Sequence, residues 1–532
     1  MRKITLLFFL AFASIPSFSQ QGERVYLSTD RDWYAAGETV YLSAFCVKTQ
    51  DEMAALSSVS AVAYAELASA DGMAAGAKIA LKEGRGAGTL ILPRNLPTGN
   101  YSLCAYTSMS KEEVLCSKVI SIYNTTSTAR VSDGIVQGDL PQNPGTPSSG
   151  LLSLQEEEGT ARLVAGTDAN VSISVFRKEP FPNYNPSWIA DVLHPVNISS
   201  EKPEIPEYDG EILTLRLTGA DGNPLDETGI PVLISRPGHK EDIYASVLQA
   251  DGTARFYTDN LFGKGDLVVT LDKPSTSFKV ETVSPFTHIL SKDIPELILN
   301  PSLSEALVAL NARMQLTAAF DADTLYTHLP VRDIPFLPGE HIVYRLDDYT
   351  RFATFQEVFV EYLSDIRAKG KDENLQLRVR SRERARGMLS FRENPSLIMI
   401  DCVPVLQHNL VYNLDPALVK SVDVYPWIIA LGGQVYSGVA NFITFKGDMG
   451  GIRFGDNVKI LDYDGVSYPV AFGPVQDDRY PNQRETLLWQ PIVNLKAGEP
   501  LELPSFDVPE GYVLVVEGLT HDGTPLYFRE AF

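Results

Sequence analysis

The chain has 532 residues, of which 44% are hydrophobic and 21% are charged, and this composition excludes wholesale disorder. Its length predicts roughly two to four domains. The formal net charge of −22 argues against nucleic acid as a partner, because a phosphate backbone repels an acidic surface.

Residues 1–19 have the pattern of a secretory signal peptide. Arg2 and Lys3 precede an apolar run over residues 4–13, and small residues stand at the positions that a signal peptidase reads. We therefore expect cleavage after Ser19 and export of the mature chain. Later apolar runs are shorter than the ~20 residues of a spanning helix, and the long succession of alternating strands of a membrane barrel is missing, so no transmembrane segment is expected.

Residues 20–125 predict a β-sandwich, which we name the N-terminal sandwich. Short alternating apolar segments separated by turns recur at 25–27, 40–45, 62–67, 88–92, 101–106 and 119–123. Residues 126–150 are rich in Ser, Thr, Gly, Pro and Gln and predict a linker. Residues 151–204 predict a further β-segment, in which 171–176 is the clearest strand.

The chain has 4 cysteines, at positions 46, 104, 116 and 402. The first three fall in the N-terminal sandwich, where an oxidising compartment would allow one disulfide among them. Buried free thiols are the alternative, because free cysteine packs as a small hydrophobic residue. The spacings do not suggest a zinc site.

Residues 205–285 predict a second sandwich, the middle sandwich, in which Asp221-Gly222 and Asp251-Gly252 mark hairpin turns. Two connecting regions follow in the chain, at 286–343 and 451–484, the first with short helical pieces around 303–316. The segment 485–532 again predicts strands but makes only half a sandwich. Because 151–204 also resembles half of one, we expect the two segments to complete one discontinuous sandwich. Pairing of strand 171–176 with the final strands would support this, and two separate sandwiches would refute it.

Residues 344–450 predict an α+β unit. A helical face is formed by Phe355, Val358, Phe359, Tyr362, Leu363 and Ile366, and Thr354 with Glu357 predicts a capping box at its start. A strand is expected at 375–379. Residues 394–445 then predict, in order, a strand, a turn, a short helix, a strand, a glycine loop and a strand.

The sequence Ile-Met-Ile-Asp-Cys-Val-Pro-Val over residues 398–405 resembles the strand and Asp-Gly-Val-Pro turn of the plug domain of TonB-dependent outer-membrane receptors. Cys402 replaces the usual glycine, Tyr425 to Ile429 replaces a small polar loop, and no TonB box follows the signal peptide. In the N-terminal sandwich, RVYLSTDRDWYAAGETVYLSAFCV and the turn at 96–101 resemble the MG2-type domain of alpha-2-macroglobulins. The middle sandwich resembles carboxypeptidase-regulatory-like and macroglobulin-like modules, which scaffold or bind.

This combination resembles a group of Bacteroidetes cell-envelope proteins. The fold class expected is mainly β, with tandem macroglobulin-like or Ig-like β-sandwiches and one plug-like α+β domain. Candidate interaction residues are those of the plug-like motif and of an arginine-rich strand: Asp401, Val403, Pro404, Trp427, Gly432, Gly433, Arg378, Arg380, Arg382, Arg384 and Arg386. Period-two spacing places these arginines on one strand face. That face is either simply solvated or a contact for an acidic partner or anionic lipopolysaccharide.

Enzyme motifs are missing from the sequence. The thioester run Cys-Gly-Glu-Gln is absent, the 7 histidines are scattered, and no nucleophile or phosphate-binding motif occurs. We expect no cofactor, no metal and no catalysis. The resemblance implies an exported periplasmic or outer-membrane-associated protein that binds another outer-membrane protein, such as a barrel. The alternative is an accessory subunit of a TonB-linked transport system that binds or delivers a ligand.

Overall fold

The computed structural model describes residues 22–531, with gaps at 51–52, 112–113, 132–134, 141–149, 158–159, 186–204, 239–241, 260, 275, 290–293, 320–326, 331–336, 338, 383–388, 392–393, 473–482, 507 and 509–510. The predicted signal peptide and much of the predicted linker lie outside the described residues. The described part is mainly β, as the sequence predicts, and it is built from several sheets.

The N-terminal sandwich is one long sheet that folds over its own core. Leu42 of the second strand in the order and Ile120 of the last but one are both fully buried in that core. Cys104 and Cys116 form a disulfide, while Cys46 is a buried free thiol, so both of the alternatives for the cysteines occur. The strand order is β1 (Glu23–Thr29), β3 (Thr39–Gln50), β7 (Arg85–Ile91), β6 (Gly72–Lys82), β5 (Val62–Ser69), β8 (Gly99–Tyr106), β9 (Leu115–Tyr123) and β2 (Trp33–Ala35), and β4 (Met53–Leu56) pairs with β3.

The discontinuous sandwich joins segments more than 300 residues apart. The central strand β13 (Ala169–Arg177) is antiparallel to β34 (Tyr512–Thr520) on one edge, with Val171 opposite Gly518, and to β32 (Thr486–Leu495) on the other. The predicted pairing is therefore confirmed. The remaining strands are β35 (Pro525–Ala531), which follows β34 in this sheet, and β11 (Leu152–Glu157), β12 (Thr160–Ala165) and β33 (Pro500–Leu503), which form the second sheet.

One strand of the middle sandwich comes from the predicted connecting region at 451–484. This strand, β30 (Val458–Asp464), pairs along β18 (Lys264–Leu271), and Tyr463 enters the core. Its partner lies almost 200 residues earlier, so local patterning gave no sign of the pairing. The two sheets are β17 (Thr253–Tyr257), β14 (Ile212–Thr218) and β19 (Lys279–Thr282), and β16 (Ile243–Val247), β15 (Pro231–Ser235), β18 and β30.

The α+β unit has the predicted order of elements. The Thr354 hydroxyl accepts a hydrogen bond from the Glu357 backbone at the start of α3 (Phe355–Glu361), which confirms the capping box. The predicted helical face extends too far, because Ile366 lies in a strand opposite Val379. The elements are β22 (Ile342–Arg345), β28 (Val419–Leu431), β29 (Gln434–Thr444), β26 (Leu397–Ile400) and β27 (Val403–Pro404) in one sheet, β23 (Ile366–Lys369), β24 (Gln376–Arg382) and β25 (Leu389–Phe391) in another, and the helices α3 and α4 (His408–Tyr412).

The connecting regions add one long helix and two short strand pairs. Helix α2 (Ser304–Ala319) replaces the predicted helical pieces, and its Leu310 packs in a cluster with Trp33 and Phe181. The short pairs are β10 (Ile135–Gln137) with β20 (Leu297–Leu299), and β21 (Thr327–His328) with β31 (Val470–Ala471). Among the described residues, no helix has the length and hydrophobicity needed to cross a membrane.

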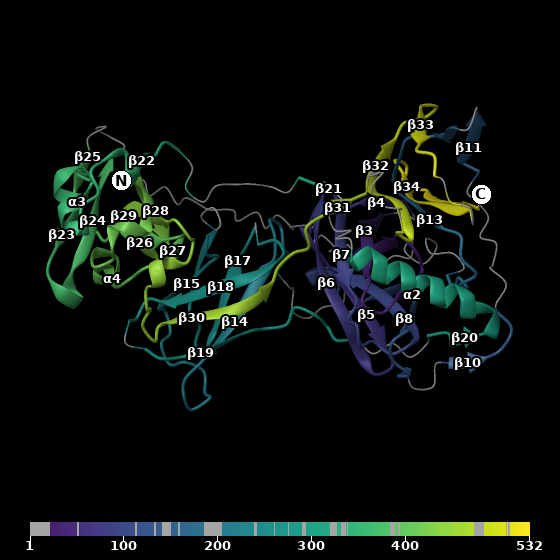
Figure 1. Ribbon diagram of the computed structural model, residues 1–532, viewed down its shortest axis with the longest axis horizontal. Coiled ribbons are helices and arrows are strands. Elements are labelled where there is room, and N and C mark those ends of the chain that lie inside the picture. Colours follow the sequence, from purple (N-terminus) through teal and green to yellow (C-terminus); the bar gives the residue numbers. More distant parts are fainter. Residues whose placement is uncertain are drawn as a thin grey trace, which may run out of the picture.

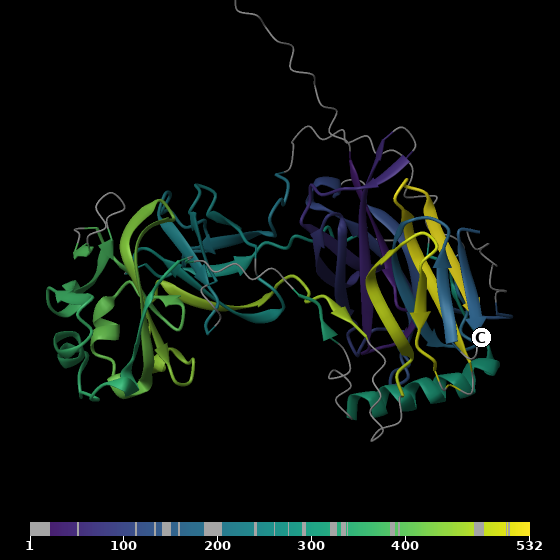
Figure 2. The same ribbon diagram turned by 90° about the horizontal axis from the view of Figure 1, so that it is seen from above.

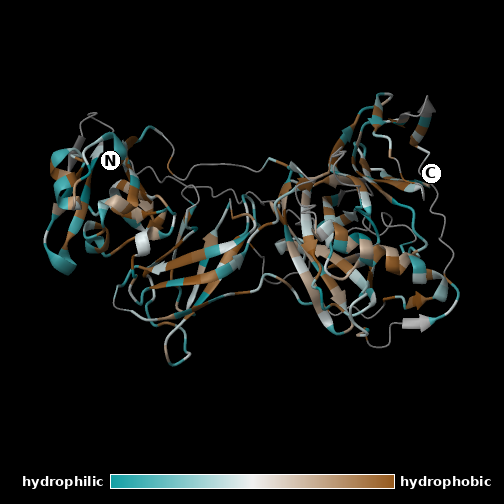
Figure 3. Cartoon of the chain, in the orientation of Figure 1, coloured by the Kyte–Doolittle hydropathy of each residue, from teal (hydrophilic) through white to brown (hydrophobic). Residues whose placement is uncertain are grey.

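The molecule is elongated and has two lobes joined by a narrower waist (Figures 1 and 2). One lobe holds the N-terminal sandwich, the discontinuous sandwich and α2, and the other holds the middle sandwich and the α+β unit. Hydrophobic residues lie along the strands in both lobes (Figure 3). Each sandwich and the α+β unit thus has its own apolar core, and both apolar clusters and polar contacts join neighbouring units.

A buried ionic cluster joins the N-terminal sandwich to the discontinuous sandwich. The Lys118 ammonium lies 3.2 Å from the Glu517 carboxylate and 3.6 Å from the Asp32 carboxylate. Glu517 also accepts hydrogen bonds from the Tyr26 and Ser28 hydroxyls. Because all these groups are buried, each charge depends on its partners for solvation.

We expect Glu517→Ala to lower the free energy of unfolding by about 3 kcal/mol, because it removes a carboxylate partner of a buried lysine. Adding Lys118→Met should restore part of that loss, because the double variant no longer has a buried ammonium without its Glu517 partner. Urea unfolding of the single and double variants measures both effects. Glu530→Ala, on the exposed side of β35, is the matched control and should change little. Equal losses for Glu517→Ala and Glu530→Ala would contradict the role of the cluster.

Candidate interaction sites

The Asp401 turn is the centre of the predicted plug-like motif, and its side chain faces inward. Its carboxylate accepts hydrogen bonds from the Thr444 backbone at 2.7 Å, the Thr444 hydroxyl at 2.6 Å and the Met449 backbone at 2.8 Å. Val403 and Pro404 are buried beside it. In this conformation these three predicted residues therefore contact the chain itself, and binding of a partner by them stays a prediction.

Cys402 lies in the turn after β26, at a backbone position that favours glycine. Its φ is +67°, in the left-handed region that glycine adopts without strain. The Cys402 backbone donates to the Asn441 side chain at 3.1 Å, and the Asn441 amide donates to the Cys402 sulfur at 3.3 Å. These contacts hold a non-glycine residue in the strained turn.

Gly432 and Gly433 form the two-residue turn between β28 and β29, with φ of +58° and +79°. Both angles fit a type I′ hairpin turn. A Cβ on Gly432 would lie 3.2 Å from the Cβ of Ala245, so the hairpin tip packs closely on the middle sandwich. The segment Tyr425 to Ile429, expected to replace a loop, instead continues β28 across a register shift. Trp427 is half-buried there and donates to the Glu340 carbonyl at 3.0 Å.

The predicted arginine face is present on β24. Leu377 and Val379 point into the core, whereas Arg378 and Arg380 alternate with them and are partly exposed. Arg380 forms an ion pair with Asp365 at 3.2 Å. Arg382 ends β24, while Arg384 and Arg386 lie outside the described residues. The six other candidate residues are in the Asp401 turn and around the β28–β29 hairpin, so the predicted residues do not form one site.

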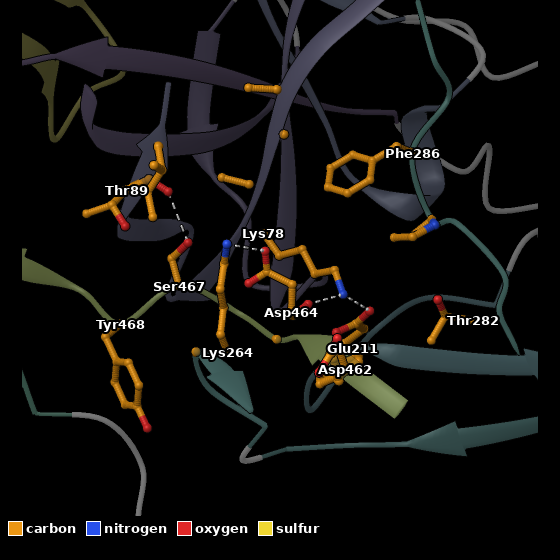
Figure 4. A pocket seen from close by; sticks show the side chains of 18 of the residues that line it. Lys78, Thr89, Glu211, Lys264, Thr282, Phe286, Asp462, Asp464, Ser467 and Tyr468 are labelled. Atoms are coloured by element: carbon orange, nitrogen blue, oxygen red, sulfur yellow. Dashed lines mark hydrogen bonds and ion pairs between the residues drawn. The ribbon is translucent and has the colours of Figure 1, made fainter. Parts of the chain in front are cut away.

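A cavity of about 710 Å³ lies at the waist, between the N-terminal and middle sandwiches (Figure 4). None of the described candidate residues lines it. Its polar lining includes Lys78, Glu211, Lys264 and Asp464, and its aromatic lining includes Phe286 and Tyr468. This cavity could not be predicted from the sequence, because its walls come from eight separate stretches of chain and only the folded waist brings them together.

Charged and aromatic side chains connect the two sandwiches beneath the cavity. The Lys78 ammonium lies 2.7 Å from the Glu211 carboxylate and donates to the Asp464 carbonyl at 2.8 Å (Figure 4). It also lies 4.7 Å from the centre of the Tyr463 ring, and the Tyr463 hydroxyl donates to Glu211. Burial and the nearby Glu211 raise the pKa of Tyr463 well above its ordinary value, which keeps this hydroxyl protonated as a donor.

Glu207 forms a second polar contact at the waist. One carboxylate oxygen accepts from the Tyr64 hydroxyl at 2.7 Å and from the Ile212 backbone at 2.9 Å. The other oxygen is buried and has no hydrogen-bond partner among the residues that the structure describes. Burial is the largest cause that raises the pKa of Glu207, and the charge of Glu211 adds to it.

The buried His408 of the α+β unit has a structural role. His408 Nδ1 accepts a hydrogen bond from the Leu377 backbone at 2.9 Å, and burial lowers the pKa of His408 to about 4. The imidazole is therefore neutral at pH 7. Among the described residues, no group of three or more His, Cys, Asp or Glu side chains lies close enough to hold a metal ion.

The strain at Cys402 predicts a difference between two variants that both lack the thiol. Cys402→Gly should have a free energy of unfolding about 1 kcal/mol higher than Cys402→Ala, because only glycine adopts the positive φ without a Cβ penalty. Urea unfolding of the two purified variants measures the difference. An alanine variant as stable as the glycine variant would show that the turn is not strained at this residue.

The raised pKa of Glu207 predicts that its charge opposes folding at high pH. Stability from this group is fully present below its ordinary pKa of about 4.3 and is lost as pH rises through the raised native pKa. Glu207→Gln should therefore be more stable than the natural chain at pH 8, by on the order of 1 kcal/mol, with no such advantage near pH 4. Urea unfolding across this range tests it. Glu281→Gln, at an exposed position, is the control, and a pH-independent effect of Glu207→Gln would contradict the assignment.

No family model matches this chain, and no curated protein matches it. Among solved structures, native E. coli alpha-2-macroglobulin is similar at 10% identity over 96% of this chain and 39% of that chain, with a TM-score of 0.24. Salmonella alpha-2-macroglobulin reacted with methylamine is similar at 11% identity over 96% and 23%, with a TM-score of 0.16. The Yersinia pseudotuberculosis adhesin InvE is similar at 11% identity over 49% and 58%, with a TM-score of 0.13. The chain thus spans less than half of either macroglobulin, and likenesses this low carry no argument about its function.

Proposed function

We propose that this chain is a non-enzymatic exported protein of the cell envelope that binds another outer-membrane protein through its α+β unit. The observation that carries the proposal is an exposed apolar surface on this unit, formed by Leu418 and Phe445 beside Arg351. We name it the Phe445 surface. Phe445 is 54% exposed and Leu418 is 41% exposed.

The Phe445 surface is built on the predicted motif. The buried Asp401 carboxylate holds Thr444, the residue directly before Phe445. The Phe445 backbone donates to the Leu418 carbonyl at 3.1 Å, which keeps the two apolar side chains on neighbouring segments. The Asp401 turn thus supports the surface from beneath.

Arg351 completes this surface. Its guanidinium donates to the Pro416 and Val419 carbonyls, both at 2.8 Å, and lies 5.6 Å from the centre of the Phe445 ring. An exposed aromatic ring beside a positioned arginine is the composition that dominates binding energy at protein interfaces. These contacts hold the arginine in place before any partner binds, which lowers the entropy cost of binding.

The rest of the α+β unit limits how a partner can approach. One face of its main sheet packs on α3, α4 and β24, and the other face carries Met399, Tyr425 and Val439 in a cluster with Ile243 of the middle sandwich. A barrel of another chain that enclosed the whole unit would have to displace the middle sandwich. We therefore propose that the partner contacts the Phe445 surface from outside.

A second candidate function is supported by the cavity at the waist. An accessory subunit of a TonB-linked transport system would need a place to hold its ligand, and the 710 Å³ cavity has the size and mixed polar and aromatic lining of a small-molecule site. This function predicts a bound small molecule at the waist, whereas the first predicts a protein at Phe445.

Photo-crosslinking in native cells tests the proposed function. A benzoylphenylalanine at position 445 should crosslink to an outer-membrane protein, because this side chain is exposed on the proposed interface. The same residue at position 257 is the matched control, since Tyr257 is an aromatic residue that is also exposed, on the middle sandwich. Crosslinks of equal yield from both positions, or none from 445, would contradict the proposal. A small molecule that copurifies and is lost from a Lys264→Glu variant would favour the second function.

A further inference from the structure

A strip of basic side chains follows the outer face of the β23–β24 hairpin. Arg378 and Arg380 alternate with the buried Leu377 and Val379, so their side chains leave the sheet on the face away from the core. Arg367 of β23 lies directly opposite Arg378 in the antiparallel register. We name these three arginines the basic strip.

The register of the basic strip has an electrostatic cost. Like charges directly opposite on neighbouring strands destabilise a sheet. Asp365 offsets part of this charge through its ion pair with Arg380, and Asp372 and Glu373 are nearby acids, in the turn that joins the two strands. Even so, residues 365–382 hold six basic and three acidic side chains in a chain whose net charge is −22. This segment thus has a local excess of basic side chains within an acidic chain.

The basic strip lies at one end of the molecule. The strands β23, β24 and β25 are at the end of the long axis that is far from the N-terminal sandwich (Figure 1). Electrostatic interactions between exposed groups fade over about 8 Å at physiological ionic strength. A surface that touches only this end is therefore screened from most of the negative charge carried by the other lobe.

We propose that the basic strip binds the phosphate groups of an anionic lipid surface and so directs the α+β unit toward a membrane. Arginine guanidinium groups donate paired hydrogen bonds to phosphate oxygens, and several of them on one flat sheet face match an array of headgroups. A flat membrane surface would touch only this end of the elongated molecule. A soluble acidic protein would also approach the acidic sides of the molecule. This inference goes beyond the proposed function, because it needs no protein partner.

Vesicle flotation with the purified full chain tests the inference. Vesicles of phosphatidylcholine with added phosphatidylglycerol should bind the chain at low salt, and vesicles of phosphatidylcholine alone should not. Arg367→Gln with Arg378→Gln should reduce partitioning roughly 30-fold, because each basic residue near an anionic surface contributes about 1 kcal/mol. Arg367→Lys with Arg378→Lys keeps the charge and should retain most of the binding.

The matched control changes the same charge elsewhere. Arg216 and Arg255 are exposed arginines on neighbouring strands of the middle sandwich, so Arg216→Gln with Arg255→Gln should leave vesicle binding within a few-fold of the natural chain. Equal losses in the two glutamine pairs would overturn the inference. A second result would also overturn the inference: the chain binds polyglutamate through the basic strip but does not bind anionic vesicles. The partner would then be an acidic polypeptide.

A measurement on the natural chain removes any dependence on how the variants fold. Anionic vesicles should protect Arg367 and Arg378 from modification by phenylglyoxal, as read by mass spectrometry, and should leave Arg216 and Arg255 reactive. Loss of protection in high salt is expected, since the contact is electrostatic. Equal reactivity of all four arginines with and without vesicles would overturn the inference. The vesicles contain no protein, so a negative result with them would contradict only the membrane inference. The proposed protein partner is tested independently by the crosslink at position 445.

Discussion

The architecture depends on the two edges of β13. This strand is central and buried, and a strand in that position needs a hydrogen-bonded neighbour on each side. Both neighbours, β32 and β34, come from the C-terminal segment. The middle sandwich and the α+β unit are therefore an insertion into one sandwich, and the chain must leave and return at the same place. Because of that constraint, several segments of the chain must cross the waist side by side.

The crossing segments are held by buried carboxylates. Glu66 accepts backbone hydrogen bonds from Thr287 at 2.7 Å and Ile289 at 3.0 Å, while Glu207 and Glu211 pair with Tyr64 and Lys78 of the N-terminal sandwich. A buried carboxylate with several donors fixes a segment more specifically than apolar packing, since few other arrangements satisfy it. The waist is thus a joint of defined geometry, and it sets how far the α+β unit stands from the other lobe.

Local chemistry made part of this fold predictable from the sequence. The capping box at Thr354, the period-two arginines of β24 and the glycine turn at Gly432 all depend on residues a few positions apart. The pairing of β13 was also predictable, because the segments 151–204 and 485–532 each make only half a sandwich. In contrast, β30 and the end of α3 depend on partners that only tertiary structure supplies: β18 for the first, and the pairing of Ile366 with Val379 for the second. The cavity and the Phe445 surface were missed for the same reason.

The Asp401 turn shows that a conspicuous sequence pattern can come from local backbone requirements. Its sequence stands out because a carboxylate, a positive φ and a proline must follow a strand in fixed order, and each requirement comes from the backbone of the α+β unit itself. Such a pattern reflects local backbone geometry, and geometry alone does not give a function. The proposed function depends on what the turn supports, which is the exposed aromatic side chain of Phe445. Recognition by surfaces of this kind needs a rigid support more than reactive groups, and the buried carboxylates of this chain supply that rigidity.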